Sequence, residues 1–504
     1  MSYEKVNKRV QRAQKTKQQW KGYIDELYAF FLPEKNLSTP TASKVNLFDS
    51  TTTDAISDYA SRMESSLVPA GRRWMKLEAG SEIPKEEEHQ VNQKLEDMTT
   101  VLFNNINSSN FSSQINECFL DLGISTGAII VEQGDGIQSS LRFRSVPLQD
   151  LILERSEKGI VETVFREITI PYLDLKGLFP DADELPNDYL IKYKQNPSLD
   201  ITLIEGVMKT ESLVSPYRSV LLFPEGKVFL RDQKLESSPW IVFREATTSG
   251  ETFGRGRAMR CLADAKTLNK VMEYYIDTCE LLGNPIYTAV DDGIINPATI
   301  VVRPKTIIPV QSADSIRPLA QSGNPELNMD LMSRLQDSIR RAMLSKPFGK
   351  IDETPVRSAT EMSIRNADLA STAGAASGRI QTELLERLIS RCVFVLKQVG
   401  KIADFRVNGK EVKIKFTSPS ARQQDEIDLA TTLRFLDTLQ AFPPEMIEQT
   451  VKVEDVPKYI AEQLGVSANL IRSPQEREAK EAEQQEKQIQ MMQAEAQAKG
   501  QPNV

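Results

Sequence analysis

The stretch that decides the fold runs from Thr247 to Leu344 and opens with Phe253-Gly254-Arg255-Gly256-Arg257. After this turn, apolar residues recur every three or four positions, at Leu262, Ala265, Leu268, Met272, Tyr275, Cys279 and Leu282. That spacing places them on one face, so it predicts an amphipathic helix of about seven turns. The pattern stops at Gly283-Asn284-Pro285, because proline cannot continue a helix and glycine tolerates the reversed backbone that ends one.

A second amphipathic pattern follows Gly323-Asn324-Pro325 and ends before Pro347. Its apolar face holds Leu327, Leu331, Leu335, Ile339 and Ala342. Between the two patterns, residues 284–324 contain five prolines and two short β-branched runs, 299–302 and 306–308. Since proline interrupts regular structure and β-branched residues favour strands, we expect a small strand-containing insertion carried on two helical legs.

The composition of the whole chain is that of a globular protein with a polar tail. It has 504 residues, of which 40% are apolar, enough for about three domains or one large elaborated domain. Its net charge is −8, from 62 basic and 70 acidic residues. Tight binding of nucleic acid depends on Lys and Arg neutralising phosphates, so we expect any DNA contact to be local or loose.

No CxxC pair occurs among the four cysteines, Cys118, Cys261, Cys279 and Cys392, which all lie within apolar helical patterns. This placement predicts buried reduced thiols rather than disulfides or metal ligands. No apolar run reaches the ~18–20 residues needed to cross a bilayer, and the basic N-terminus has no apolar segment behind it. We therefore expect a protein without a membrane span in a reducing, aqueous compartment.

The N-terminal segment is strongly basic, because residues 1–22 contain seven cations against the single acid Glu4. Apolar residues at helical spacing follow, up to Phe31. One interpretation is a solvated helix that docks late in folding. The other is a basic arm that touches an acidic neighbouring subunit or DNA.

The rest of the chain mixes helical and strand patterns. Helical patterns cover residues up to Leu67 after a cap at Asp49 or Ser50, then 86–122, 359–400 and 420–472, with a kink expected at Gly374 and Gly378. Short β-rich runs separated by turns fill 128–244, and Phe405 to Phe416 predicts a hairpin turning at Asn408-Gly409. The predicted fold class is therefore α+β. Residues 474–504 predict a solvated helix or a disordered tail.

The sequence offers no arrangement that supports catalysis. It lacks a G-x-x-x-x-G-K-[ST] loop, and Gly254-Arg255-Gly256 is not followed by the third small residue of a dinucleotide site, since Met259 stands there. His89 is the only histidine, which excludes His-rich metal sites and leaves Ser or Cys without its usual base. Paired acids such as Asp291-Asp292 lie in turns, where solvated carboxylates are common. We expect a protein that is not an enzyme and uses no cofactor or metal.

Three segments then point, in this order, to a family. They are Phe48 to Trp74, Gly250 to Arg257 leading into a helix with Leu268-Asn269, and Ser358-Ala359-Thr360-Glu361 leading into Glu383 to Ile389. Over roughly residues 20–440 the chain resembles the head-to-tail connector, or portal, proteins of podovirus-type bacteriophages. It departs from them at Arg257, where the family has proline, and at Ser358, where it has threonine. Neither position is known to carry chemistry.

The resemblance implies a portal fold, in which subunits form a homo-oligomeric ring, a dodecamer, at one capsid vertex. Residues 1–257 would form an α+β wing, completed by 359–417 and including a long helix over 359–400. Residues 258–283 and 325–345 would be stem helices, 284–324 the clip, 346–358 the tunnel loop, 418–473 a helical crown, and 474–504 a polar C-terminal tail.

The resemblance also implies a channel through which double-stranded DNA is packaged and later ejected. The expected partners are the terminase motor, tail or adaptor proteins, and the major capsid and scaffolding proteins, in a virion whose subunits are made in the host cytoplasm. We expect the channel to be lined by Lys346, Lys350, Arg340, Arg341 and Arg357. Such cations would guide phosphates in transient contacts without sequence preference. Arg340 and Arg341 could instead pair with acids of a neighbouring subunit.

Two other interpretations stay open at the level of sequence. One is a non-portal head completion or adaptor ring protein, which we expect to lack the order of leg, insertion and leg. The other is a DNA-processing hydrolase, which nuclease and ATPase assays would detect.

Overall fold

The computed structural model describes residues 2–36, 45–80, 83, 85–157, 159–283, 287–289, 316–318, 325–345, 378–403, 412–417, 419–439, 451, 456–463 and 480. The helices are α1 (Tyr3–Phe31), η1 (Pro33–Asn36), α2 (Thr51–Leu67), α3 (Lys85–Asn107), α4 (Phe111–Ile124), η2 (Tyr172–Asp174), α5 (Leu175–Leu178), α6 (Asn187–Gln195), α7 (Ala258–Gly283), α8 (Pro325–Ala342), η3 (Gln381–Leu385), α10 (Glu386–Gln398), α11 (Pro419–Leu439) and α13 (Val456–Gln463). The strands are β1 (Met75–Ala79), β2 (Thr126–Gln133), β3 (Leu141–Ser145), β4 (Leu151–Arg155), β5 (Val161–Pro171), β6 (Asp200–Lys209), β7 (Tyr217–Phe223), β8 (Val228–Leu235), β9 (Trp240–Arg244), β10 (Tyr287–Ala289), β11 (Ile316–Pro318) and β12 (Val412–Phe416). All strand pairs in these ranges are antiparallel, so the predicted α+β class is confirmed.

Strand β2 lies at the centre of the body, in a three-stranded sheet of order β3-β2-β9. Successive side chains of a strand point to opposite faces. Ile129 and Val131 therefore enter a core completed by α3, α4 and α10, while Ala128 and Ile130 enter one completed by α1, α7 and α8. The unbroken apolar run of β2 reflects burial on both faces.

A five-stranded meander of order β4-β5-β6-β7-β8 forms the second sheet. The N-terminal half of α1 packs on one face with Val6, Val10 and Ala13, and α5 and α6 cover the other. The basic N-terminal segment is thus docked on its own chain and is not a free arm. The sequence did not predict α6, because its nine residues make fewer than three helical turns and show little of a period.

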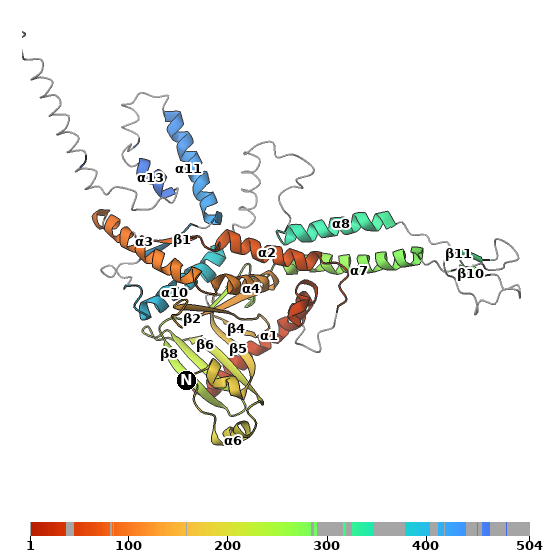
Figure 1. Ribbon diagram of the computed structural model, residues 1–504, viewed down its shortest axis with the longest axis horizontal. Helices are drawn as coiled ribbons and strands as arrows, with labels where there is room; N and C mark the ends of the chain where they lie inside the picture. Colours follow the sequence, from red (N-terminus) through yellow and green to blue (C-terminus); the bar gives the residue numbers. More distant parts are fainter. Residues whose placement is uncertain are drawn as a thin grey trace, which may run out of the picture.

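Helices α7 and α8 project together from the body, and β10 and β11 pair at their far end (Figure 1). We call α7 and α8 the leg. The two helices predicted from apolar spacing are therefore present, and the insertion between them contains a strand pair. The predicted runs 299–302 and 306–308 lie outside the described residues. No helix in the described ranges is both long and apolar enough to cross a membrane.

The C-terminal part of the chain contributes a strand and a helix to the body. Strand β12 pairs with β1, with Phe416 opposite Met75, and the Asn408-Gly409 turn lies outside the described residues. A π-helical turn, η3, leads directly into α10. The kink predicted at Gly374 and Gly378 stays a prediction, because residues 346–377 lie outside the described residues and the described helix begins at Gly378.

Candidate functional site

The leg begins at a glycine turn that lies directly on the backbone of the body. The Ser125 hydroxyl donates to the carbonyl of Gly254 at 2.7 Å, and the Gly254 amide donates to Thr126 Oγ1 at 2.8 Å. A Cβ atom at Gly256 would lie 2.2 Å from the carbonyl oxygen of Gly123, so only glycine permits this approach. The turn therefore serves to seat α7 against the start of β2.

Arg257 follows the glycine turn and is buried where the leg joins the body. Its Nε lies 2.6 Å from Glu245 Oε1, and the Tyr59 hydroxyl donates to Glu245 Oε2 at 2.8 Å. Arg257 Nη1 also donates to the carbonyl of Ala342, at 3.4 Å, in the last turn of α8. Burial, and then the charge of Glu245, raises the pKa of Tyr59 well above its usual value, so the phenol remains a donor. Arg257, to which the sequence assigned no role, ties both leg helices to α2.

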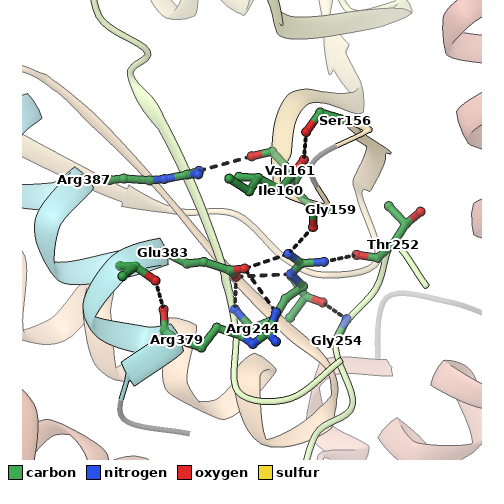
Figure 2. Close-up of polar contacts among 12 residues, drawn as sticks. Ser156, Gly159, Ile160, Val161, Arg244, Thr252, Gly254, Arg379, Glu383 and Arg387 are labelled. Carbon is green, nitrogen blue, oxygen red and sulfur yellow. Dashed lines mark hydrogen bonds and ion pairs between the residues drawn. The ribbon is translucent and has the colours of Figure 1, made fainter. Parts of the chain in front are cut away.

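A second buried ion pair joins the body to the helix that follows the leg (Figure 2). Arg244 Nη2 lies 2.7 Å from Glu383 Oε1, and the Arg244 Nε and backbone amide both donate to Glu383 Oε2 at 3.1 Å. The same guanidinium donates to the carbonyls of Thr252 and Gly159, each at 3.1 Å. Arg379 reaches Glu383 at 3.6 Å. One arginine thus connects β9, the turn before α7, the β4–β5 connection and η3.

Polar contacts also fix the half of the leg that lies next to the body, which we call the near half; the other is the far half. Ser338 donates to Asp264 at 2.8 Å, which links α8 to α7, and Gln336 donates to Asp49 at 2.7 Å, just before α2. Three apolar side chains of this segment are buried in the core, Met332 and Ile339 of α8 and Met343 directly after it. The near half of the leg is therefore part of the body's core.

The far half of the leg exposes apolar side chains. They are Tyr274, Ile276, Leu281 and Leu282 of α7 and Met329 and Leu331 of α8, each 38–56% exposed; we call these six residues the apolar patch. The near part of the α7 stripe, Leu262, Ala265 and Leu268, is buried within the chain. The near part of the predicted apolar stripe therefore packs within one subunit, and only the far end of the stripe is exposed to solvent. At about 100° per residue, residues two positions apart on a helix point in nearly opposite directions, so Tyr274 and Ile276 lie on different sides of α7, and Met329 and Leu331 on different sides of α8. The six residues therefore expose apolar surface on more than one side of the leg.

Cys279 lies on the far half of α7 and is exposed, whereas Cys118, Cys261 and Cys392 are buried. The prediction of four buried thiols is therefore wrong for Cys279, because its part of α7 extends beyond the body. Burial raises the pKa of Cys261 and of Cys392 to about 12, and it raises that of Cys118 as well. These three thiols stay protonated at neutral pH, so Cys279 is the accessible one.

Helix α8 carries a charged face with alternating sign. Asp330, Arg334, Asp337 and Arg341 recur at intervals of three or four residues, so they share one side of the helix. Arg334 pairs with Asp330 at 2.9 Å. The structure places the candidate Arg341 on this face, exposed, and the candidate Arg340 beside it, half-buried. The other channel candidates, Lys346, Lys350 and Arg357, lie outside the described residues.

The chain leaves α8 through a tight reversal. Leu344 has a φ of 55°, which is unusual for a branched residue. Its amide donates to the carbonyl of Arg341 at 3.1 Å, and the Ser345 amide donates to that of Arg340 at 2.8 Å. These are the two bonds of a Schellman motif. Arg62 of α2 donates to the Ser345 carbonyl at 3.1 Å, so the reversal ends against α2.

In the described residues, no group of three or more His, Cys, Asp or Glu side chains is placed to hold a metal ion. The side chain of His89 lies outside the description. Sequence reasoning missed the pairs Arg244–Glu383 and Arg257–Glu245. The available signal was Arg244 at the end of the apolar strand β9 with Glu245 directly after it, where a buried charge is tolerated only when it is paired.

Comparison with known proteins identifies the family to which this chain belongs. A family model described as bacteriophage head to tail connecting protein matches residues 3–471. Comparison with curated proteins gives no match. Among solved structures, the chain is similar to a chain of the "Virion of native gene transfer agent (GTA) particle", with 9% sequence identity and a TM-score of 0.37 over 76% of this chain and 89% of that one. Since the family match spans nearly the whole sequence, the chain belongs to the bacteriophage head to tail connecting proteins.

Proposed function

We propose that this connector forms a ring, a dodecamer, at one capsid vertex, and that double-stranded DNA is packaged and ejected through its centre. Membership of the family makes it a structural component that joins head and tail. The observation that carries the proposal is the leg. Its near half is anchored by the buried pair Arg257–Glu245, while its far half exposes the apolar patch. A single subunit leaves that patch uncovered, and neighbouring copies arranged around an axis would cover it.

In this ring α7 and α8 form the stem, with residues 325–345 as its second part, and the insertion 284–324 forms the clip. Residues 1–257, completed by 359–417 with η3, α10 and β12, form the wing, while α11 and α13 belong to the crown. The clip would meet the terminase motor during packaging and tail proteins afterwards. Its support is the position of β10 and β11, at the end of the leg and away from the body (Figure 1).

Negative-stain microscopy of the purified full chain tests the ring directly. Rings with a central hole support the proposal. A monomer or a solid globule at every protein concentration would rule it out.

Reaction of Cys279 with a thiol reagent tests where the subunits touch. Single subunits separated by size-exclusion chromatography should react at one thiol, because the other three are buried. In rings that thiol should react at least about tenfold more slowly, since a neighbouring copy covers the far half of the leg. Absorbance with an aromatic disulfide reagent follows both rates. The variant Cys279→Ser should lose the reaction, and equal rates in rings and subunits would contradict the proposed stem contact.

The segment 346–358 is proposed as the tunnel loop, with Lys346, Lys350 and Arg357 facing DNA together with Arg340 and Arg341. Its support is the reversal at Leu344, which brings the chain out beside α2. We expect Lys346→Ala with Lys350→Ala to reduce packaged and retained genome on the order of fivefold, because one exposed charge contact contributes up to about 1 kcal/mol. Quantitative PCR of nuclease-protected DNA measures it. Lys94→Ala with Lys194→Ala is the matched control on the body, and wild-type packaging in both variants would count against the channel assignment.

A further inference from the structure

Helix α1 has two opposite faces in its N-terminal half. Val6, Val10 and Ala13 are buried against the five-stranded sheet. Four exposed cations follow one another at intervals of three, four and three residues, namely Lys5, Lys8, Arg12 and Lys15. Ten residues of helix rise about 15 Å, so these cations form a row of that length. We call them the basic row.

The sheet carboxylates next to α1, Glu154 and Glu167, do not pair with the basic row, because they engage other residues. Glu154 accepts from Arg9 at 2.7 Å, and Glu167 accepts from Gln14 at 3.5 Å. Within the described ranges, no ion pair joins any member of the basic row to an acid. The neighbouring exposed residues Gln11, Gln18 and Gln19 add neutral amide donors, and Glu4 is the nearby exposed acid. The row therefore presents donors of one charge sign to solvent.

The chemistry of this surface distinguishes between possible partners. The cores of protein interfaces are enriched in aromatic residues and depleted of lysine, and the row contains three lysines and no aromatic residue. A helix that lies in a membrane surface needs an exposed apolar face, whereas the apolar face of α1 is buried in the sheet. Binding of single-stranded nucleic acid uses aromatic stacking, which the row also lacks. Evenly spaced cations with amide donors match the phosphates of a duplex.

We propose that the basic row of α1 binds the phosphate backbone of double-stranded DNA, without sequence preference, at a surface separate from the leg. In Figure 1, α1 lies along the five-stranded sheet, with its N-terminus away from the end of the leg that carries β10 and β11. The contact uses one subunit's own helix, so it holds whether or not a ring forms. It also agrees with the chain's net charge of −8, since four local cations give a weak, salt-sensitive contact.

Fluorescence anisotropy with a short random-sequence duplex tests the proposal at several salt concentrations. Four phosphate contacts predict a slope of log K against log salt of about −3.6, or roughly a hundredfold loss between about 50 and 200 mM. The variant carrying Lys5→Gln, Lys8→Gln, Arg12→Gln and Lys15→Gln should lose at least about tenfold in affinity at the lower salt, with a slope near zero. All four side chains are exposed, so its thermal stability should match the wild type.

A matched control removes three lysines and one arginine from separate elements of the body. It carries Lys94→Gln, Arg142→Gln, Lys194→Gln and Lys234→Gln, all exposed positions. This variant has the same net charge as the row variant and should keep wild-type affinity and slope. Equal losses in both variants would show a general charge effect and overturn the proposal, as would unchanged binding by the row variant. Equally tight, row-dependent binding of anionic vesicles or polyglutamate would overturn the assignment to DNA.

Discussion

Replacing Arg244 with methionine is expected to lower the free energy of unfolding by about 3–5 kcal/mol. The Arg244 side chain is 1% exposed and that of Glu383 is 9% exposed, so the substitution leaves a carboxylate in the core with only the more distant Arg379 to balance it. It also removes the donors to the carbonyls of Thr252 and Gly159, and unmet buried acceptors cost further free energy. The substitution therefore removes the side-chain contacts of Arg244 in β9 with three other parts of the chain at once.

Urea denaturation, followed by the fluorescence of the buried Trp74 and Trp240, measures this loss at fixed protein concentration. The double variant Arg244→Met with Glu383→Leu should recover part of the stability, because it removes both charges together. Arg142→Met on β3, where the arginine is exposed, is the matched control and should change the free energy by no more than about 0.5 kcal/mol. A loss below about 1 kcal/mol in Arg244→Met would mean that the pair is not a structural connection.

The helices of the leg could be predicted from the sequence because their signal is local. Apolar residues at a period near 3.6 between the 253–257 turn and Gly283-Asn284-Pro285 mark α7, and the same spacing marks most of α8. Strand β2 was predictable for a similar reason, since a continuous apolar run bounded by turns favours a buried strand. In each case the residues that decide the structure are close together in the chain.

The connections between elements could not be predicted, because they depend on partners that are distant in sequence. Glu383 lies 139 residues after Arg244, and no spacing rule relates them. Cys279 continues a periodic stripe whose near part is buried, so the pattern alone could not show where the body ends. The basic N-terminal segment left two interpretations open, and the structure shows that α1 has both a docked face and an exposed charged face.

The glycine turn has a local sequence signal, but its role depends on a partner that is distant in sequence. Gly254-Arg255-Gly256 was visible in the sequence as a turn, yet its role comes from the backbone of residues 123–126, more than a hundred positions earlier. The absent third small residue argued against a dinucleotide site, and the structure supplies a positive reason for the glycines. They allow two backbone segments to touch where the leg meets the body.

Replacing Gly256 with alanine is therefore expected to lower the free energy of unfolding by about 3 kcal/mol, at the upper end of overpacking effects. The new Cβ atom would lie 2.2 Å from the Gly123 oxygen and 2.4 Å from the carbonyl carbon of Ile124, and neither backbone atom can rotate away. The strain must move the start of α7, so we also expect fewer rings from this variant at equal protein concentration. Urea denaturation and ring counts in negative stain measure the two effects.

Gly22→Ala is the control that separates steric conflict from the loss of a glycine. Gly22 lies inside α1, and a Cβ atom added there would have no neighbour within 4 Å, so alanine should stabilise the protein by up to about 1 kcal/mol through helix propensity. Opposite signs for the two substitutions would tie the Gly256 effect to the contact between the backbones of the leg and the body. If Gly256→Ala were as stable as the wild type and formed as many rings, the turn could not be what orients the leg.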